Sequence, residues 1–247
     1  MKNKSVRKQR VIEEEITVAE ELQENEEVTQ VSKIQQLIIN NKYLVIGLCA
    51  GIILVIAVVL IFFTNKDAKE NEASLVLSRV MPYFSNSNFE LALNGEPKVK
   101  IRGESVVGML GIVDKYAGTA SGKLAALYVG NIYLFQNKFK EAEEYFDIAL
   151  KANSKLVQTG ANAGLGACLE SKNKFEEAAE YYEVASKLAV DDGTVDRYLY
   201  YTGLCYEKAK KSSEAEKYYR EIVNKNQFSE FLNSAKSGLI RIGTIIE

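Results

Sequence analysis

The carboxyl-terminal half of this chain repeats itself at spacings of 36 and 37 residues. Small residues mark the register at Gly130, Gly166 and Gly203, and twelve residues further on at Ala142, Ala178 and Ala215. An aromatic residue follows each alanine after four positions, at Phe146, Tyr182 and Tyr219. Self-similarity at this period predicts a solenoid, in which each unit buries its apolar face against the next unit.

Within each unit the pattern predicts two antiparallel helices. In residues 139–150 the apolar residues recur at helical spacing, with lysines and glutamates between them. Short polar segments at 136–138 and 172–174 predict the turns inside two of the units. A glycine or alanine lets paired helices approach closely, and the aromatic residue fills the space beside it.

This arrangement of small and aromatic residues resembles the tetratricopeptide repeat. The resemblance implies an all-α fold, an α-solenoid with repeats at 123–156, 159–192 and 196–229 and a capping helix at 230–247. The chain departs from the usual pattern at the early tryptophan of each repeat, where it has Ala126, Asn162 and Leu199. The closing proline of the repeat is missing, and the longer period implies longer loops between repeats.

Residues 43–63, YLVIGLCAGIILVIAVVLIFF, predict a single transmembrane helix before the solenoid. This segment has 21 positions without a charged residue, and a helix of that length spans about 30 Å, the thickness of a hydrocarbon core. Helices in a soluble core rarely lack polar residues over such a length. A cleaved signal peptide has a shorter apolar segment and a small-residue cleavage site. We therefore expect a retained single-pass anchor in the lipid bilayer.

The tail before this segment, residues 1–42, predicts the orientation of the anchor. Its basic residues are Lys2, Lys4, Arg7, Lys8, Arg10, Lys33 and Lys42. A short basic tail favours the cytoplasmic side, and acidic residues contribute little to this preference, although the glutamate-rich run from Glu13 to Glu27 makes the tail nearly neutral. We expect the tail in the cytoplasm and the repeats outside it. The alternative is the reversed topology, a receptor that faces the cytosol.

Residues 64–122 predict a helical linker and a degenerate first repeat. We expect a helix over 68–85, and the segment NSNFELALNG at 86–95 resembles a repeat turn whose second helix is cut short. Residues 94–103 break the pattern with Pro97 and glycines, and residues 104–116 return to a helical period.

The sequence nominates no catalytic or metal-binding constellation. It contains no histidine, the commonest general acid–base and metal ligand. GTASGKL at 118–124 is one residue short of a phosphate-binding loop and has Leu124 in place of the magnesium-binding Ser or Thr. The segment 191–193 lacks the oxygen spacing of a calcium loop and predicts a turn, with Thr194 or Asp196 capping the next helix. We expect no enzymatic activity, no cofactor and no metal.

Charge and cysteine content point to protein partners. The 31 basic and 33 acidic residues give a net charge of −2, which leaves no basic surplus for nucleic acid. Cys168 and Cys205 form no CxxC motif, and buried free thiols are favoured over a disulfide between them. We therefore expect neither nucleic acid nor a small-molecule substrate as the ligand.

The first helix of each repeat predicts a concave binding groove. By the repeat register its partner-binding residues are Leu124, Leu127, Asn131, Leu134 and Phe135 in the first repeat and Arg197, Tyr200 and Leu204 in the third. The same face includes Ala163, Ala167, Glu170 and Glu207. Leu127, Gly164 and Tyr201 do not match the carboxylate clamp of some tetratricopeptide proteins. The groove is apolar and suits hydrophobic segments of a partner, although some of these residues could instead pack against neighbouring helices.

The stretch 81–150 carries a narrower resemblance. MPYFSNSNFELALNG, and then GMLGIVDKYAGTASGKLAALYVGNIYLFQNKFKEAEEYFDIAL with its KYAGT lead-in at 115–119, resemble the YfgM-like ancillary subunits of the Sec translocon of Gram-negative bacteria. This resemblance implies a bacterial inner-membrane protein with periplasmic repeats. Its partners would be Sec channel subunits, exported clients and periplasmic chaperones. The alternative is a general scaffold for a cell-wall or division complex of the envelope, without client transfer.

Overall fold

The structure is a computed structural model that describes residues 40–101, 103–225 and 227–244. The chain divides into two compact units, Met1–Thr64 and Asn65–Glu247, and each is described by itself. The predicted cytoplasmic tail lies outside the described residues, apart from its last three positions.

In the first unit, the apolar segment 43–63 is helical and belongs to α2 (Lys42–Ser85). Its described large apolar side chains are all exposed, and the helix is long and apolar enough to cross a membrane. The helix does not end with the apolar segment, because α2 continues through Thr64 into the predicted helical linker. The segment 64–67 contains neither glycine nor proline, and the Thr64 hydroxyl donates to the Leu60 carbonyl at 3.0 Å, so nothing there ends a helix.

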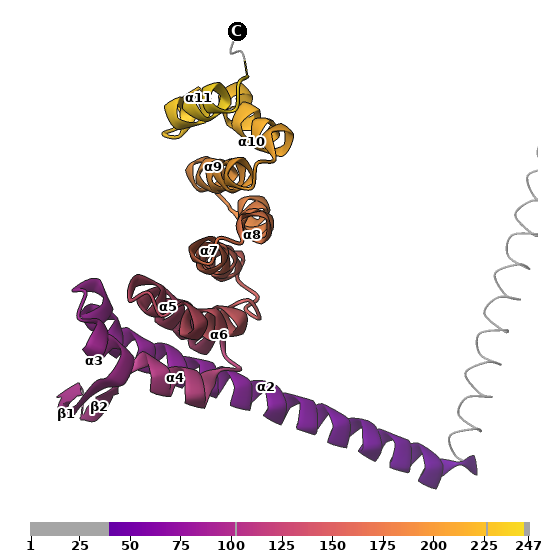
Figure 1. Ribbon diagram of the computed structural model, residues 1–247. Helices are drawn as coiled ribbons and strands as arrows, with labels where there is room; N and C mark the ends of the chain where they lie inside the picture. Colours follow the sequence, from indigo (N-terminus) through magenta and orange to yellow (C-terminus); the bar gives the residue numbers. More distant parts are fainter. Residues whose placement is uncertain (1–39, 102, 226, 245–247) are drawn as a thin grey trace, which may run out of the picture. The chain divides into compact units, whose positions relative to one another are not determined.

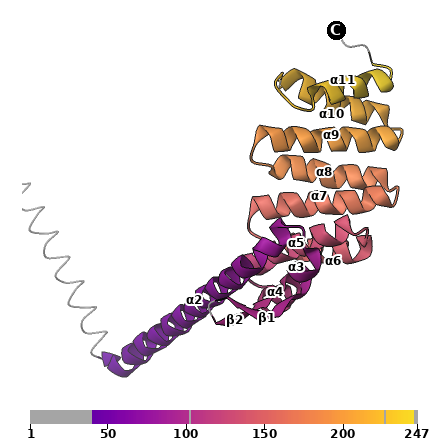
Figure 2. The same cartoon turned by 90° about the vertical axis from the view of Figure 1, so that its left-hand side faces the viewer.

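The second unit contains an α-solenoid, which confirms the predicted fold class. The helices of this solenoid are α5 (Ala120–Phe135), α6 (Phe139–Ala149), α7 (Lys155–Ser171), α8 (Phe175–Leu188), α9 (Asp192–Lys208), α10 (Ser212–Lys225) and α11 (Leu232–Arg241). They stack successively from α5 to α11 (Figure 2). The first helices of the hairpins, α5, α7 and α9, form one layer with α11, and α6, α8 and α10 form the other (Figure 1). The first-helix layer is defined as α5, α7, α9 and α11.

Each hairpin closes with the same turn. One residue adopts a left-handed conformation, with φ between 58° and 61°, at Ser87, Asn137, Asn173 and Lys210. The amide of the following residue donates to the carbonyl five positions back, as from Lys138 to Tyr133 at 2.8 Å, which is the bond of a Schellman motif. Because Ser87 makes this turn too, the end of α2 and the short α3 (Phe89–Asn94) form a truncated helical hairpin.

The close approach of helices depends on glycines around buried aromatic rings. A Cβ atom on Gly130 would lie 2.6 Å from the ring of Phe146, and one on Gly164 would lie 2.3 Å from it. Phe146 of α6 is fully buried, and its ring therefore fits only because α5 and α7 both present a glycine. Tyr219 of α10 is held in the same way between Gly203 of α9 and Gly238 of α11.

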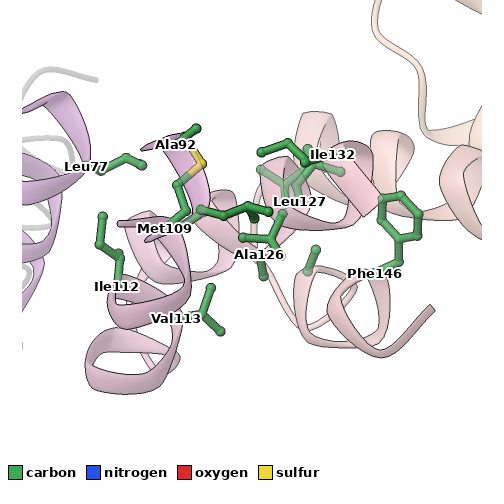
Figure 3. Close-up of a cluster of buried hydrophobic side chains, with 14 of the residues drawn as sticks. Leu77, Ala92, Met109, Ile112, Val113, Ala126, Leu127, Ile132 and Phe146 are labelled. Atoms are coloured by element: carbon green, nitrogen blue, oxygen red, sulfur yellow. The ribbon is translucent and has the colours of Figure 1, made fainter. Parts of the chain in front are cut away.

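A continuous core joins the end of α2 to the solenoid through α4 (Met109–Tyr116). Figure 3 labels nine members of this core, from Leu77 of α2 to Phe146 of α6. Polar contacts secure the same junction. The Glu70 carboxylate accepts hydrogen bonds from the amides of Ala120 (2.6 Å) and Ser121 (3.0 Å), at the positive end of the α5 dipole. Thr119 caps the same helix by accepting from the Gly122 amide at 2.9 Å.

The prediction of a helix over 104–116 was wrong in its first residues. β1 (Gly95–Ile101) and β2 (Glu104–Val107) form an antiparallel hairpin before α4 begins at Met109. β2 pairs with β1 through Gly95–Val107, Glu96–Val106, Lys100–Ser105 and Ile101–Glu104, and Val106 is its one buried residue. The adjoining glycines, Gly95 and Gly103, have φ of 77° and 85°, which other residues rarely adopt.

Two helix ends also differ from the expectation. Asp191, rather than Thr194 or Asp196, caps α9, because its carboxylate accepts from the Thr194 amide at 2.7 Å. The capping helix α11 covers Leu232–Arg241 and is shorter than the predicted 230–247, since Gly243 adopts a φ of 83° just beyond it.

The glycine packing gives a stability prediction. Gly164→Ala should lower the free energy of unfolding by about 1–3 kcal/mol, because the added methyl group overlaps the Phe146 ring. Gly193→Ala is the matched control, since a Cβ there meets its nearest atom at an ordinary 3.6 Å. Thermal unfolding of the full chain in detergent, followed by circular dichroism, measures both. Equal melting temperatures for the two variants would contradict this packing.

Candidate partner-binding groove

The first-helix layer carries all eight predicted groove residues, but with unequal exposure. Asn131, Phe135 and Arg197 are exposed. Leu124, Leu134, Tyr200 and Leu204 are half-buried. Leu127 is buried, with 8% of its surface exposed. The predicted set therefore divides into surface residues and one packing residue.

Leu127 belongs to the contact between α5 and α7. A Cβ atom on Gly160 of α7 would lie 3.1 Å from both Leu127 methyl groups. The glycine thus makes room for the leucine, and a partner bound on the surface does not reach it. The expectation that Leu127 lines an accessible groove is corrected accordingly.

An aromatic row surrounds Phe135. The Phe135 side chain is 73% exposed and meets Phe89 edge-on, with the ring centroids 5.2 Å apart. Phe89 contacts Phe84 at 6.1 Å, and Phe84 contacts Tyr128 at 4.7 Å. Sequence reasoning missed Phe84, Phe89 and Tyr128. The repeat register could have found Phe84, because it precedes the turn residue by three positions, as Leu134 does.

A second aromatic group lies on α9 and the start of α11. We define the tyrosine cluster as Tyr198, Tyr200, Tyr201 and Phe231. The Tyr200 ring stacks on Phe231 with centroids 5.5 Å apart and contacts Tyr201 at 6.0 Å. Tyr201 and Tyr198 both contact Tyr182 of α8, at 5.4 Å and 6.5 Å. Tyr200 was predicted as a groove residue from the repeat register. Its neighbours Tyr201 and Phe231 were not.

Two glutamates of this face are paired within the protein. Glu170 accepts a hydrogen bond from the Tyr182 hydroxyl at 3.3 Å and binds Lys208 at 2.6 Å. Glu207 repeats this arrangement with the Tyr219 hydroxyl at 2.7 Å, and with Arg241 through two bonds of 2.7 and 2.8 Å. Each glutamate is held by the tyrosine of its own repeat and by a cation from the next first helix.

The first repeat has an apolar version of the same arrangement. Leu134 stands where the other repeats have Glu170 and Glu207, and Phe146 stands where they have tyrosine. Ser171 replaces the cation. At this repeat position, tyrosine therefore occurs only in the repeats that also have a glutamate to accept from its hydroxyl, which keeps this buried polar group satisfied.

The pairing changes the acidity of Glu207. Burial raises the pKa of this carboxyl, but the hydrogen bonds from Arg241 and Tyr219 outweigh that effect and hold the pKa below its usual range. The Arg197 guanidinium is also paired, with Glu230 at 3.5 Å. The charged residues predicted to face the groove, Glu170, Arg197 and Glu207, are thus all neutralised by partners inside the protein.

The acidic and cysteine side chains of the described residues were compared with the requirements of a metal site and of a reactive thiol. They contain no cluster of three or more histidine, cysteine or acidic side chains that could hold a metal ion. Cys168 and Cys205 are free and buried, and burial raises the pKa of their thiols to about 11 and about 12. Thiols with such pKa values are almost entirely protonated at neutral pH and are poor nucleophiles.

Comparison with known families identifies the repeats. A tetratricopeptide repeat model matches residues 130–192, which run from α5 through α8 to the first residue of α9. A comparison with curated proteins gives no match to the chain. Residues 130–192 are therefore similar to tetratricopeptide repeats, which supports a role in protein–protein interaction.

The paired glutamates give a second stability prediction. Glu207→Leu should lower the free energy of unfolding by about 1–3 kcal/mol, because it leaves the buried Tyr219 hydroxyl without an acceptor. Adding Tyr219→Phe recreates the apolar pair of the first repeat and should restore part of this loss. A double-mutant cycle measured by thermal unfolding quantifies the coupling.

The control for this cycle is Glu216→Leu on α10. Glu216 pairs with Arg220 on an exposed helix face, so its replacement should change the free energy of unfolding by less than about 1 kcal/mol. Strictly additive effects of Glu207→Leu and Tyr219→Phe would argue against the proposed coupling.

Proposed function

We propose that this chain is a membrane-tethered module for protein–protein interaction, whose first-helix layer binds apolar segments of a partner. The observation that carries this proposal is the aromatic surface of that layer. Phe135 is 73% exposed, and the tyrosine cluster is half-buried. Exposed aromatic groups on a helical repeat surface are typical anchors for a bound polypeptide.

The tether is the apolar part of α2. Residues 43–63 have the length and composition of a membrane span, and their described large apolar side chains are exposed. The basic residues of the tail support an orientation with the amino terminus in the cytoplasm and the repeats in the periplasm.

The more specific role is that of an ancillary subunit of the Sec translocon, which passes exported proteins to periplasmic chaperones. The resemblance over 81–150 supports this role. Its KYAGT lead-in lies where α2 joins the solenoid, since Lys115 and the Tyr116 hydroxyl bind Glu72 at 2.8 and 2.7 Å. Unfolded exported chains expose apolar side chains, which suit an apolar groove whose predicted charges are internally paired.

Site-specific photocrosslinking in living cells tests the groove. Crosslinkers placed at Phe135 and Arg197 should capture a partner, whereas one at Val184 on α8 should not. Phe135→Asp should lower partner co-purification about tenfold, because it puts a charge at an aromatic anchor. Val184→Asp is the control, since Val184 is also apolar and exposed, at 41%, but lies in the other layer.

The identity of the captured proteins separates the two roles. Recovery of Sec channel subunits favours the translocon role, and recovery of wall-synthesis or division proteins alone favours the envelope scaffold. Equal crosslinking from Phe135 and Val184 would contradict the groove assignment.

A phosphatase fused after Glu247 tests the orientation. We expect an active enzyme, because alkaline phosphatase folds only after export to an oxidising compartment. A fluorescent protein that requires the cytoplasm, fused at the same position, is the reciprocal control. An inactive phosphatase with a bright fluorescent fusion would establish the reversed topology.

A further inference from the structure

We infer that the tyrosine cluster binds an extended, proline-containing and uncharged peptide segment. This inference rests on the proposed function and specifies the chemistry of the partner. It follows from the rings, the hydroxyl groups and the charges at the carboxyl-terminal end of the first-helix layer.

The tyrosine cluster exists because α9 lacks a glycine that α7 has. Gly164 and Tyr201 both stand nine residues before the turn residue of their hairpins. Gly164 lets Phe146 enter the space between α5 and α7. Tyr201 instead packs beside Tyr182, with centroids 5.4 Å apart, and continues to Phe231 at 6.4 Å. The four rings therefore pack against the edge of the core and remain half-buried, as a platform.

Within residues 40–101, 103–225 and 227–244, the structure gives the hydroxyl groups of this platform no acceptor. Tyr182 and Tyr219 donate to glutamates, but among the described residues Tyr198, Tyr200 and Tyr201 have no hydrogen-bond partner for their hydroxyls. In the described part of the chain, the buried side-chain atoms without a partner are Arg79 Nε and Thr159 Oγ1. The three hydroxyls therefore reach solvent and can donate to a ligand.

An extended proline-containing segment matches these donors. A polyproline II chain forms no internal hydrogen bonds, so its carbonyl oxygens are available as acceptors, and proline contributes no N–H donor. Its flat rings pack on aromatic faces, and its preformed shape lowers the entropy cost of binding. A helical ligand satisfies its own carbonyl groups and would leave the tyrosine hydroxyls without acceptors.

The charges near the platform favour an uncharged ligand. Arg197 is bound to Glu230, Glu207 to Arg241, and Glu170 to Lys208. A charged segment would have to compete with these pairs or lose its hydration without compensation. An uncharged segment disturbs none of them.

Fluorescence anisotropy with the full chain in detergent micelles tests this inference. The probe is a labelled, uncharged peptide of about ten residues, half of them proline, which spans about 30 Å when extended. The comparison peptide has alanine at each proline position. We expect the alanine peptide to bind at least tenfold more weakly.

Hydroxyl deletions provide the matched variants. Tyr198→Phe, Tyr200→Phe and Tyr201→Phe keep the rings, and each should weaken binding of the proline peptide about three- to tenfold, the effect of one lost hydrogen bond. Tyr206→Phe is the control, because the Tyr206 ring stacks on Tyr218 at 5.7 Å within its own hairpin. This control should bind as the wild type does.

The outcomes separate this inference from the proposed function. Equal binding of the two peptides, or unchanged binding in all three phenylalanine variants, overturns the inference. Failure of the proline peptide to bind, together with productive crosslinking from Phe135 and Arg197, overturns the inference but leaves the groove intact. Failure of both peptide binding and crosslinking overturns the groove as well.

Discussion

The first and third hairpins of the solenoid depend on placing one large aromatic ring between the glycines of two successive first helices. Phe146 lies between Gly130 and Gly164, and Tyr219 lies between Gly203 and Gly238. Protein interiors are packed as densely as organic crystals, so such a ring fits only where the helix surface lacks a side chain. The ring in turn sets how closely α5 approaches α7, and how α11 closes the stack over α10.

The truncated hairpin at the start of the solenoid follows from the absence of this ring. Seven residues before the Ser87 turn stands Val80, where the full repeats have glycine. Nine residues after the turn stands Glu96, where they have Phe146, Tyr182 and Tyr219. Without an aromatic residue to bury, a second helix of full length gains little there. Instead, α3 ends at Asn94 and the chain continues into the β-hairpin of β1 and β2. Glu96 of β1 accepts a hydrogen bond from the Tyr83 hydroxyl at 2.6 Å.

The fold was predictable from sequence because its determinants recur. Glycine, alanine and aromatic residues at a fixed spacing predict helix pairs without any knowledge of tertiary contacts. The β-hairpin of β1 and β2 was not predictable from the sequence. Val106 and Val107 fit a helical period with the apolar residues of α4 as well as they fit a strand. The helical linker predicted after the apolar segment begins without a break, since the polar residues at 64–67 include no glycine or proline to end α2.

The candidate site was only partly predictable, because exposure depends on the neighbouring helix. Leu127 and Tyr200 occupy the same repeat position, yet Leu127 is buried on Gly160 while Tyr200 stacks on Phe231. The repeat register predicts which face of the helix a residue lies on. Whether its side chain is exposed depends on the size of the residue that it meets on the neighbouring helix. Phe231 comes from outside the repeats, so no internal comparison could have nominated it.

The ion pairs on the first-helix layer make it a poor binding surface for a charged partner. Glu170 and Glu207 lie on the predicted groove, but each is already bound by a tyrosine and a cation. Breaking such a pair leaves an uncompensated charge and costs more than an exposed ion pair returns. A partner therefore gains most from the aromatic rings and from hydroxyl groups that lack acceptors. The paired charges hold successive helices together, and the recognition that we propose for this surface rests on aromatic contacts and hydrogen-bond donors.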